Sequence, residues 1–235
     1  MDRQIFIIVT AYNEAELIGA TLDALASAFP GADVLLADDG STDTTASIAA
    51  GRGAQVVGSE RMLGKGEAAT LAAREALGNA RARQVEQQAV FVLCDGDLGP
   101  SAAALSVLAE AVVAGEADLA VAAFSRRVGG GIGLARGFAR WAIRRRCGLE
   151  TVAPISGQRA VSAAALADVL PFAHGFGMEV GMTIDAVRAG HNVVELELDL
   201  THRASGRTLA GFRHRGAQLL HFARVYVSRG TLATR

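Results

Sequence analysis

The sequence has little cysteine, few aromatic residues and no long uninterrupted run of apolar residues. Its two cysteines, Cys94 and Cys147, lack the spacing of a paired motif, which argues against a disulfide scaffold or a zinc ribbon and fits a reducing cytoplasm. No stretch reaches the roughly 18 consecutive apolar residues of a membrane-spanning helix. The N-terminus predicts a strand rather than a signal peptide. We therefore expect a globular cytoplasmic protein.

Several common enzyme signatures are also missing. The glycines around Lys65 have the wrong spacing for a P-loop, and no G-x-G-x-x-G turn follows the first predicted strand, which disfavours a dinucleotide-binding fold. The sequence contains neither the G-x-S-x-G motif of serine hydrolases nor the H-E-x-x-H motif of zinc proteases. The function must therefore be read from other residues.

Charge is divided unevenly along the chain. Residues 1–118 carry 17 acidic and 7 basic side chains, whereas residues 119–235 carry 7 acidic and 16 basic ones. Of the 23 basic residues, only Lys65 is a lysine. The acidic half suits a bound metal, and the basic half suits a phosphate, a membrane surface or the acidic half itself.

Predicted strands and helices alternate over the first 124 residues. Short apolar runs predict strands at 5–12, 33–40, 54–59, 89–97 and 118–124. Apolar residues at helical spacing or helix-start signals predict helices at 13–29, 41–51, 64–80 and 101–115. Because the strands are apolar on both faces, we expect an α/β fold with a parallel sheet covered by helices.

The pattern changes after residue 125. We expect a loop rich in glycine and arginine at 126–137, a basic helix at 138–148, a short strand at 156–163 and a helix at 175–190. Apolar and polar residues alternate over 192–203, which predicts a strand with one solvent-exposed face, antiparallel or at a sheet edge. We expect a catalytic domain at 1–203, with a basic loop and helical tail at 204–235 packed on it.

Four polar clusters lie where predicted strands end or where a helix begins. They are Tyr12-Asn13-Glu14, Asp38-Asp39-Gly40-Ser41, Gly64-Lys65-Gly66 and Asp95-Gly96-Asp97. The carboxyl ends of parallel strands share one edge, so these groups should converge there. Helix capping explains one such cluster, but four in order indicate a ligand site.

This ordered set resembles the family-2 nucleotide-sugar glycosyltransferases, which have the glycosyltransferase A-type fold. The resemblance is carried by T-A-Y-N-E, D-D-G-S-T-D, G-K-G and D-G-D, with S-G-Q-R at 156–159, and it covers about residues 5–203. It implies a Rossmann-like, mostly parallel sheet with flanking helices and a late antiparallel edge. Polyprenyl-phosphate sugar transferases and sugar-phosphoglycerate synthases are the two similar branches. The G-K-G-E-A and E-V-G…D-L-T-H-R stretches favour the second branch.

The D-x-D element, Asp95-Gly96-Asp97, fits a divalent cation. Carboxylate oxygens are ligands that Mg²⁺ or Mn²⁺ accepts, and the cation offsets the charge of a diphosphate leaving group. The resemblance implies that Asp97 binds the metal and that Asp95 contacts ribose or a metal-bound water. It also makes His202 a candidate metal ligand, although a structural role for this histidine is equally open. The remaining histidines are expected to be structural.

Other residues are candidate contacts of the donor. The resemblance implies that Asp39 accepts a hydrogen bond from the base and that Tyr12 and Glu14 line the base and ribose pocket. A turn carboxylate and a first-turn helix charge are the alternatives for the two acids. Lys65, the only ammonium side chain and flanked by glycines, is expected near phosphate.

Two further features concern the reaction itself. Glu179 begins a predicted helix, where it either deprotonates an acceptor hydroxyl or matches the helix dipole. The segment 203–212 is basic and glycine-containing, so we expect Arg203 and Arg207 to contact the diphosphate when it closes over the site.

The basic stretches at 126–146 and 203–235 suit an anionic partner. We expect an acceptor bearing a phosphate or polyprenyl phosphate. Trp141 lies among arginines in the sequence, which suits peripheral contact with the inner face of the membrane. A solvated face and the subunit contact of a homodimer are the alternative explanations. Nucleic acid is not expected, because no aromatic stacking platform accompanies the arginines.

The sequence thus predicts a metal-dependent glycosyltransferase. It would move a sugar from a nucleoside-diphosphate sugar, with a UDP-sugar favoured, to a phosphate-bearing or lipid-linked acceptor. One alternative is a catalytically silent nucleotide-binding or membrane-associated scaffold, against which the intact Asp95/Asp97 pair argues. The other is a sugar nucleotidyltransferase, against which the missing glycine- and arginine-rich loop after the first strand argues.

Overall fold

A seven-stranded sheet organises the part of the chain that the structure describes. The computed structural model describes residues 4–59, 61–124, 134–200 and 209–230, with side chains described outside 209–218. The strands are β1 (Ile5–Ala11), β2 (Asp33–Asp38), β3 (Gln55–Gly58), β4 (Val90–Asp95), β5 (Leu119–Phe124), β6 (Arg159–Ser162) and β7 (Val193–Leu198). Their order is β3-β2-β1-β4-β6-β5-β7, and β6 alone runs antiparallel to its neighbours. The predicted mostly parallel α/β sheet is confirmed.

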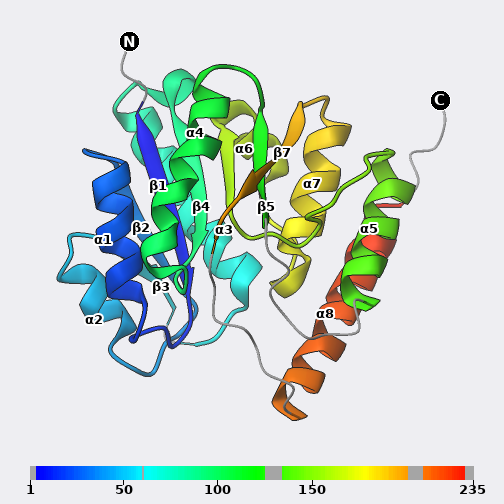
Figure 1. Cartoon of the computed structure of the whole chain (residues 1–235), viewed down its shortest axis with the longest axis horizontal. Coiled ribbons are helices and arrows are strands. Elements are labelled where there is room, and N and C mark those ends of the chain that lie inside the picture. Colours follow the sequence, from blue (N-terminus) through cyan, green and yellow to red (C-terminus); the bar gives the residue numbers. More distant parts are fainter. Residues whose placement is uncertain (1–3, 60, 125–133, 201–208, 231–235) are drawn as a thin grey trace.

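Helices cover both faces of this sheet (Figure 1). One face is covered by α1 (Ile18–Ala28), α2 (Thr45–Ala50), the 3₁₀ segment η2 (Gly99–Leu105) and α4 (Ser106–Val113). The other is covered by α3 (Lys65–Ala82), α6 (Ala163–Val169) and α7 (Met178–Arg188). Two short 3₁₀ segments, η1 (Glu86–Gln88) and η3 (Gly175–Gly177), precede β4 and α7. Among the described residues, no helix combines the length and the hydropathy needed to cross a bilayer.

Two more helices form an outer layer beside α7. These are α5 (Leu134–Cys147) and α8 (Leu209–Ser228), which lie side by side at the right of Figure 1. Ile143 of α5, Ile184 of α7 and Phe222 of α8 are fully or almost fully buried in one small apolar cluster. The last helix therefore packs against the element that immediately follows η3.

The alternation of side chains along β1 explains why the sheet needs helices on both sides. Ile7 and Val9 point into the core with α1 and α4, whereas Phe6 and Ile8 point into the core with α3 and α6. All four side chains have no exposed surface. Successive residues of a strand face opposite sides, so a strand apolar throughout is stable only between two layers.

The late strands differ in part from the sequence prediction. The 192–203 segment was expected to be antiparallel or at an edge; β7 is the edge strand and runs parallel to β5. The antiparallel strand is β6, in the interior of the sheet. The polar face of β7 is also less exposed than expected, because the Glu195 carboxylate accepts hydrogen bonds from Thr151 and from the backbone of 152 and 153. Helix α6 was not predicted.

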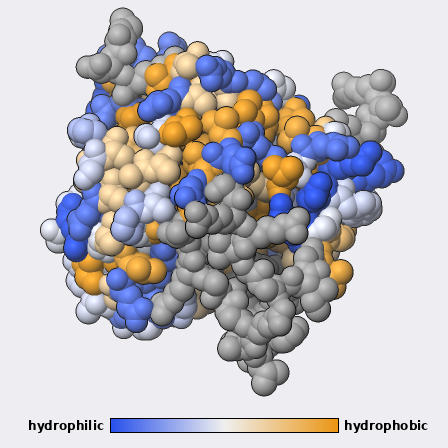
Figure 2. Space-filling view, viewed as in Figure 1, coloured by the Kyte–Doolittle hydropathy of each residue, from blue (hydrophilic) through white to orange (hydrophobic). Residues whose placement is uncertain are grey.

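The front surface is mixed in polarity. Figure 2 shows apolar side chains gathered in the upper middle of this face and hydrophilic ones along its right side, near the end of α5. Phe124, Val194 and Leu196 are only partly buried where they pack on the core. The edge of the sheet at β7 is thus covered less completely than its centre.

Two glycines of α3 test how closely this helix approaches its neighbours. A Cβ on Gly66 would overlap the carbonyl oxygen of Ala173, whereas one on Gly78 would meet nothing within 4 Å. We expect Gly66→Ala to lower the free energy of unfolding by about 3 kcal/mol or more, because backbone must move. We expect Gly78→Ala to raise it by up to about 1 kcal/mol through helix propensity. Urea denaturation of both variants measures the difference, and similar small effects would contradict the close approach.

Candidate active site

Lys65 joins two carboxylates at the carboxyl end of β4. Its Nζ lies 2.7 Å from Asp95 Oδ1 and 2.7 Å from Glu179 Oε1. Lys65 begins α3, Asp95 ends β4 and Glu179 lies in the first turn of α7. The Glu179 side chain is 6% exposed, but those of Lys65 and Asp95 are 22% and 30% exposed, so a ligand can reach them.

Asp95 has further hydrogen bonds that fix its orientation. Thr10 Oγ1 donates to Oδ1 at 3.0 Å, and Gln158 Nε2 donates to Oδ2 at 2.7 Å. A Cβ at Gly157 would lie 2.6 Å from Asp95 Oδ2 and 2.8 Å from Lys65 Nζ, so only glycine fits there. The sequence singled out S-G-Q-R only as a family feature and did not predict the contacts of Thr10 and Gln158.

The charges of this cluster reinforce one another. Burial opposes ionisation of Asp95, but the Lys65 charge and the hydrogen bonds outweigh it, so the pKa of Asp95 lies below its usual range. Burial likewise opposes the charged form of Lys65, but Asp95 and Glu179 hold the pKa of Lys65 above its ordinary value. Lysine and aspartate are therefore both ionised at neutral pH.

The first two polar clusters pack together beside this site. Asp39 Oδ1 accepts hydrogen bonds from the backbone N–H groups of Leu63 and Gly64, each at 2.8 Å, so it holds the segment that leads into Lys65. Asn13 Oδ1 accepts from the backbone N–H of Thr42 at 2.8 Å. The backbone N–H of Glu14 donates to Thr45 Oγ1, and Tyr12 is 42% exposed. The convergence expected from strand order is present.

The D-x-D element has the charge and the donor atoms that a hard divalent cation needs. Burial raises the pKa of Cys94 well above its usual value, and the charges of Asp95 and Asp97 raise it further. The carboxylates of Asp95 and Asp97 are oxygen ligands of the kind that Mg²⁺ or Mn²⁺ accepts. Asp97, half-buried just beyond β4, supplies oxygen donors. Among the described residues no group of three potential ligands is assembled, and His202, Arg203 and Arg207 lie outside those residues.

Segment η3 places Glu179 and is held from two sides. Glu67 of α3 forms hydrogen bonds with His174 Nδ1 and with the backbone N–H of Gly175. From α8, His221 Nδ1 accepts a hydrogen bond from the backbone N–H of Phe176 at 3.1 Å. Both histidines therefore have structural contacts, whereas the sequence reasoning did not single out Glu67.

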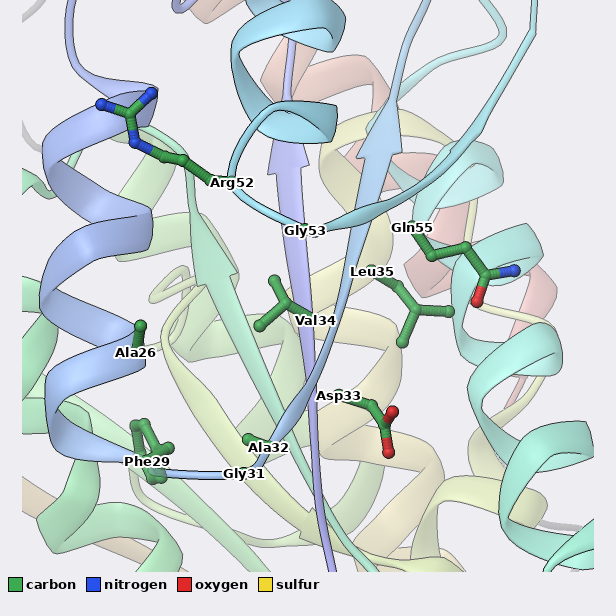
Figure 3. Close-up of a pocket in the computed structure, with 10 residues that line it drawn as sticks. All are labelled: Ala26, Phe29, Gly31, Ala32, Asp33, Val34, Leu35, Arg52, Gly53 and Gln55. Atoms are coloured by element: carbon green, nitrogen blue, oxygen red, sulfur yellow. The ribbon is translucent and has the colours of Figure 1, made fainter.

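A separate cleft is lined by none of these groups (Figure 3). Its volume is about 240 Å³, and its lining includes Asp33, Leu35, Arg52 and Gln55. Asp33 begins β2, and β2 runs away from the cleft towards Asp38 and Asp39. The cleft therefore lies at the amino end of the strand, opposite the converging polar groups, and we do not assign the chemistry to it.

The fold and this site define a glycosyltransferase of the A-type fold. The chain matches the family described as Glycosyl transferase family 2 over residues 6–152. It therefore belongs to glycosyl transferase family 2.

Two mycobacterial relatives of this chain have the same activity. The chain is 29% identical to the glucosyl-3-phosphoglycerate synthase of Mycolicibacterium paratuberculosis over 208 residues, which are 78% of this chain and 60% of the relative. It is 30% identical to that of Mycobacterium tuberculosis over 209 residues, with the same coverage of 78% and 60%. The chain thus spans about 60% of the length of the curated relatives it matches.

Solved structures of the Mycobacterium tuberculosis enzyme are similar over most of this chain. The complex with phosphoglyceric acid has a TM-score of 0.75 at 28% identity and covers 97% of this chain and 80% of that chain. The complex with Mn²⁺, UDP and glucosyl-3-phosphoglycerate has a TM-score of 0.73 at 27% identity, with coverage of 97% and 80%. A complex with Mg²⁺ and UDP has a TM-score of 0.72 at 29% identity and covers 97% and 79%.

The contact between His221 and η3 predicts a pH-dependent stability. Burial, then the charges of His174 and Arg224, lower the pKa of His221, and Glu67 opposes them only in part. The folded state thus favours the neutral ring, whose stabilising effect is full above the unfolded pKa of about 6.5 and is lost as the pH falls below it. His221→Asn keeps an acceptor but does not titrate.

We expect wild-type protein to lose stability between about pH 7 and pH 5 more steeply than His221→Asn does. Urea denaturation across this pH range measures the two slopes, and NMR titration of the ring should give a midpoint below about 6.5. Identical slopes together with an ordinary midpoint would contradict the assignment.

Proposed function

We propose that this protein is a metal-dependent glucosyltransferase that transfers glucose from UDP-glucose to a small phosphate-bearing acceptor of the phosphoglycerate type. The observation that carries the proposal is the ion pair of Lys65 with Asp95 and Glu179, which joins the D-x-D strand to α7 at the carboxyl edge of the sheet. The similarity to glucosyl-3-phosphoglycerate synthases, with complexes that contain UDP-glucose and phosphoglyceric acid, supports the choice of donor and acceptor.

The uridine part of the donor would lie across the ends of β1 and β2. Asp39 uses Oδ1 for the backbone of Leu63 and Gly64, which leaves Oδ2 to accept from the ring N–H of the base. Tyr12 and Glu14 would line the base and ribose. Asp95, oriented by its fixed hydrogen bonds, would contact ribose.

The diphosphate would lie near the D-x-D element. Asp97 and His202 would hold Mg²⁺ or Mn²⁺, and this cation would stabilise the negative charge that develops on the leaving UDP. Lys65 would add a compact positive charge from the start of α3, and Arg203 and Arg207 would contact the phosphates and help exclude water.

Glu179 is the proposed acceptor base. The ammonium of Lys65 lies 2.7 Å from this carboxylate and would fix its orientation towards an acceptor hydroxyl. Its place in the first turn of α7 also matches the helix dipole, so this structural role remains the alternative. A phosphate-bearing acceptor whose hydroxyl reacts would need such a base, whereas a polyprenyl phosphate would not.

The decisive assay is transfer from radiolabelled UDP-glucose to 3-phosphoglycerate, glycerol 3-phosphate or polyprenyl phosphate, with and without Mn²⁺. We expect transfer to a small acceptor, loss of transfer on chelation, and a fall of about 100-fold or more in Asp97→Ala. Glu110→Ala, which changes an exposed acid of α4, is the matched control and should keep wild-type activity. UDP-glucose binding without transfer to any acceptor would instead support the silent scaffold.

We further propose that the outer face of α5 and α8 contacts an anionic membrane surface. On α5, Leu134 and Trp141 are 67% and 48% exposed, and Arg140, Arg144 and Arg145 are exposed beside them. Leu220 and Val227 of α8 are 66% and 73% exposed. Apolar side chains flanked by arginines suit the interface of an anionic bilayer.

The aromatic residues of this α5–α8 face pack against one another and against Arg146. The Trp141 ring lies 4.7 Å from Tyr226 and 5.4 Å from Phe138, and the Arg146 guanidinium lies 3.6 Å from the Tyr226 ring centre. The tryptophan is thus fixed at the surface rather than packed in the core. A homodimer that uses this face is the competing explanation.

Trp141 is the only tryptophan, so its fluorescence reports on this face alone. We expect phosphatidylglycerol vesicles, but not phosphatidylcholine vesicles, to shift its emission to the blue. Replacing Arg140, Arg144 and Arg145 by Gln should abolish the shift, because each charge near the surface contributes about 1 kcal/mol. The matched control replaces three exposed arginines near or in α3, namely Arg74, Arg81 and Arg83, by Gln. A concentration-dependent shift without vesicles, with dimer mass by light scattering, would contradict membrane contact.

A further inference from the structure

Arg159 is a fully buried cation directly behind the site. It begins β6, in the interior of the sheet, and has no exposed surface. Its Nε donates to the Ser156 carbonyl oxygen at 2.8 Å, and its Nη1 donates to Thr183 Oγ1 at 2.9 Å. Its Nη2 is buried and has no hydrogen-bond partner among the described residues. Such a group is costly, and a neutral residue would fill the space at less cost.

The two hydrogen bonds of Arg159 connect it to a residue that contacts Glu179 and to the segment that holds Asp95. Thr183 Oγ1, which accepts from Arg159, donates to the backbone carbonyl of Glu179 at 3.0 Å. The guanidinium is therefore tied to the first turn of α7. On the other side, Ser156 adjoins Gly157 and Gln158, and Gln158 holds Asp95. One side chain thus links the first turn of α7, which carries Glu179, to the segment whose Gln158 donates a hydrogen bond to Asp95.

The charge of Arg159 also completes the balance of the cluster. Asp95 and Glu179 are negative, and Lys65 and Arg159 are positive. Burial lowers the pKa of Arg159 to about 10, and Glu179 and Glu195 oppose this effect, so the guanidinium stays charged at neutral pH. Without it, two carboxylates would share one ammonium in a poorly solvated place, and their mutual repulsion would be balanced less completely.

We propose that Arg159 is a positioning residue for glycosyl transfer, which holds Glu179 in register with Lys65 and Asp95 and balances their charge. The part of this inference that concerns catalysis rests on the proposed function. The part that concerns the geometry of the cluster does not, and Lys65 allows it to be tested separately.

Because Lys65 is the only lysine, lysine labelled at Cε and Nζ gives one side-chain NMR signal from the cluster. We expect this signal to shift in Arg159→Lys, which keeps the charge but loses the forked hydrogen bonds. It should also shift in Thr183→Val, which removes the hydroxyl link and keeps the shape. The matched control is Arg188→Lys in the same helix as Thr183, because Arg188 donates to the backbone oxygens of Arg146 and Arg229 instead. A Lys65 signal that is unchanged in both test variants would overturn the proposal.

Kinetics test the catalytic part on the same variants. We expect kcat to fall by about 10- to 100-fold in Arg159→Lys and Thr183→Val, with the KM for UDP-glucose less affected. Arg159→Gln, which also removes the charge, should lower kcat at least as much as Arg159→Lys.

The outcomes separate the two hypotheses. Wild-type protein that transfers no sugar would overturn the proposed function, while a shifted Lys65 signal in the variants would still support the positioning role. Wild-type protein that is active, with variants that keep its kcat and an unshifted Lys65 signal, would overturn the positioning role alone. If Arg159→Gln does not fold, the NMR and kcat comparisons of Arg159→Lys and Thr183→Val decide the question.

Discussion

The ion pair of Lys65 with Asp95 and Glu179 constrains the positions of the helices and strands around it. An ammonium group can reach two carboxylates at 2.7 Å only if α3, β4 and α7 end or begin at one place. The chain must also leave room for it, which explains why Gly157 lies beside Lys65 Nζ. Lysine offers a compact charge on a flexible stem, and this is the one position in the chain where that residue is used.

The outer helices contribute to the site although they lie away from the sheet. Helix α7 carries Glu179, and it is packed between the sheet and the layer formed by α5 and α8. His221 of α8 and Glu67 of α3 hold η3 from opposite sides. Our division of the chain at residue 203 stays a prediction, but α8 contacts η3 and α7 and is not only part of the protein surface.

The fold shows where the unevenly distributed charges of the sequence lie. The acidic first half supplies the D-x-D carboxylates, and the basic second half supplies the buried Arg159 behind them. Most arginines of α5 face outward instead, around Trp141. The basic half thus provides one buried cation near the Lys65 cluster and several exposed arginines on α5.

The sequence alone determined the features that depend on local burial and on motif order. The two-sided apolar runs of β1, β2 and β4 predicted a covered parallel sheet, and strand order predicted that Asp39, Lys65 and Asp95 converge. Only the tertiary structure decided the direction of β6, the exposure of Glu195 and the contacts of Gln158 and Arg159. The periodicity of apolar residues predicts whether a residue is buried, but not which distant residue it contacts. Gln158 and Asp95 are 63 positions apart, and only the packing of β6 against β4 brings them together.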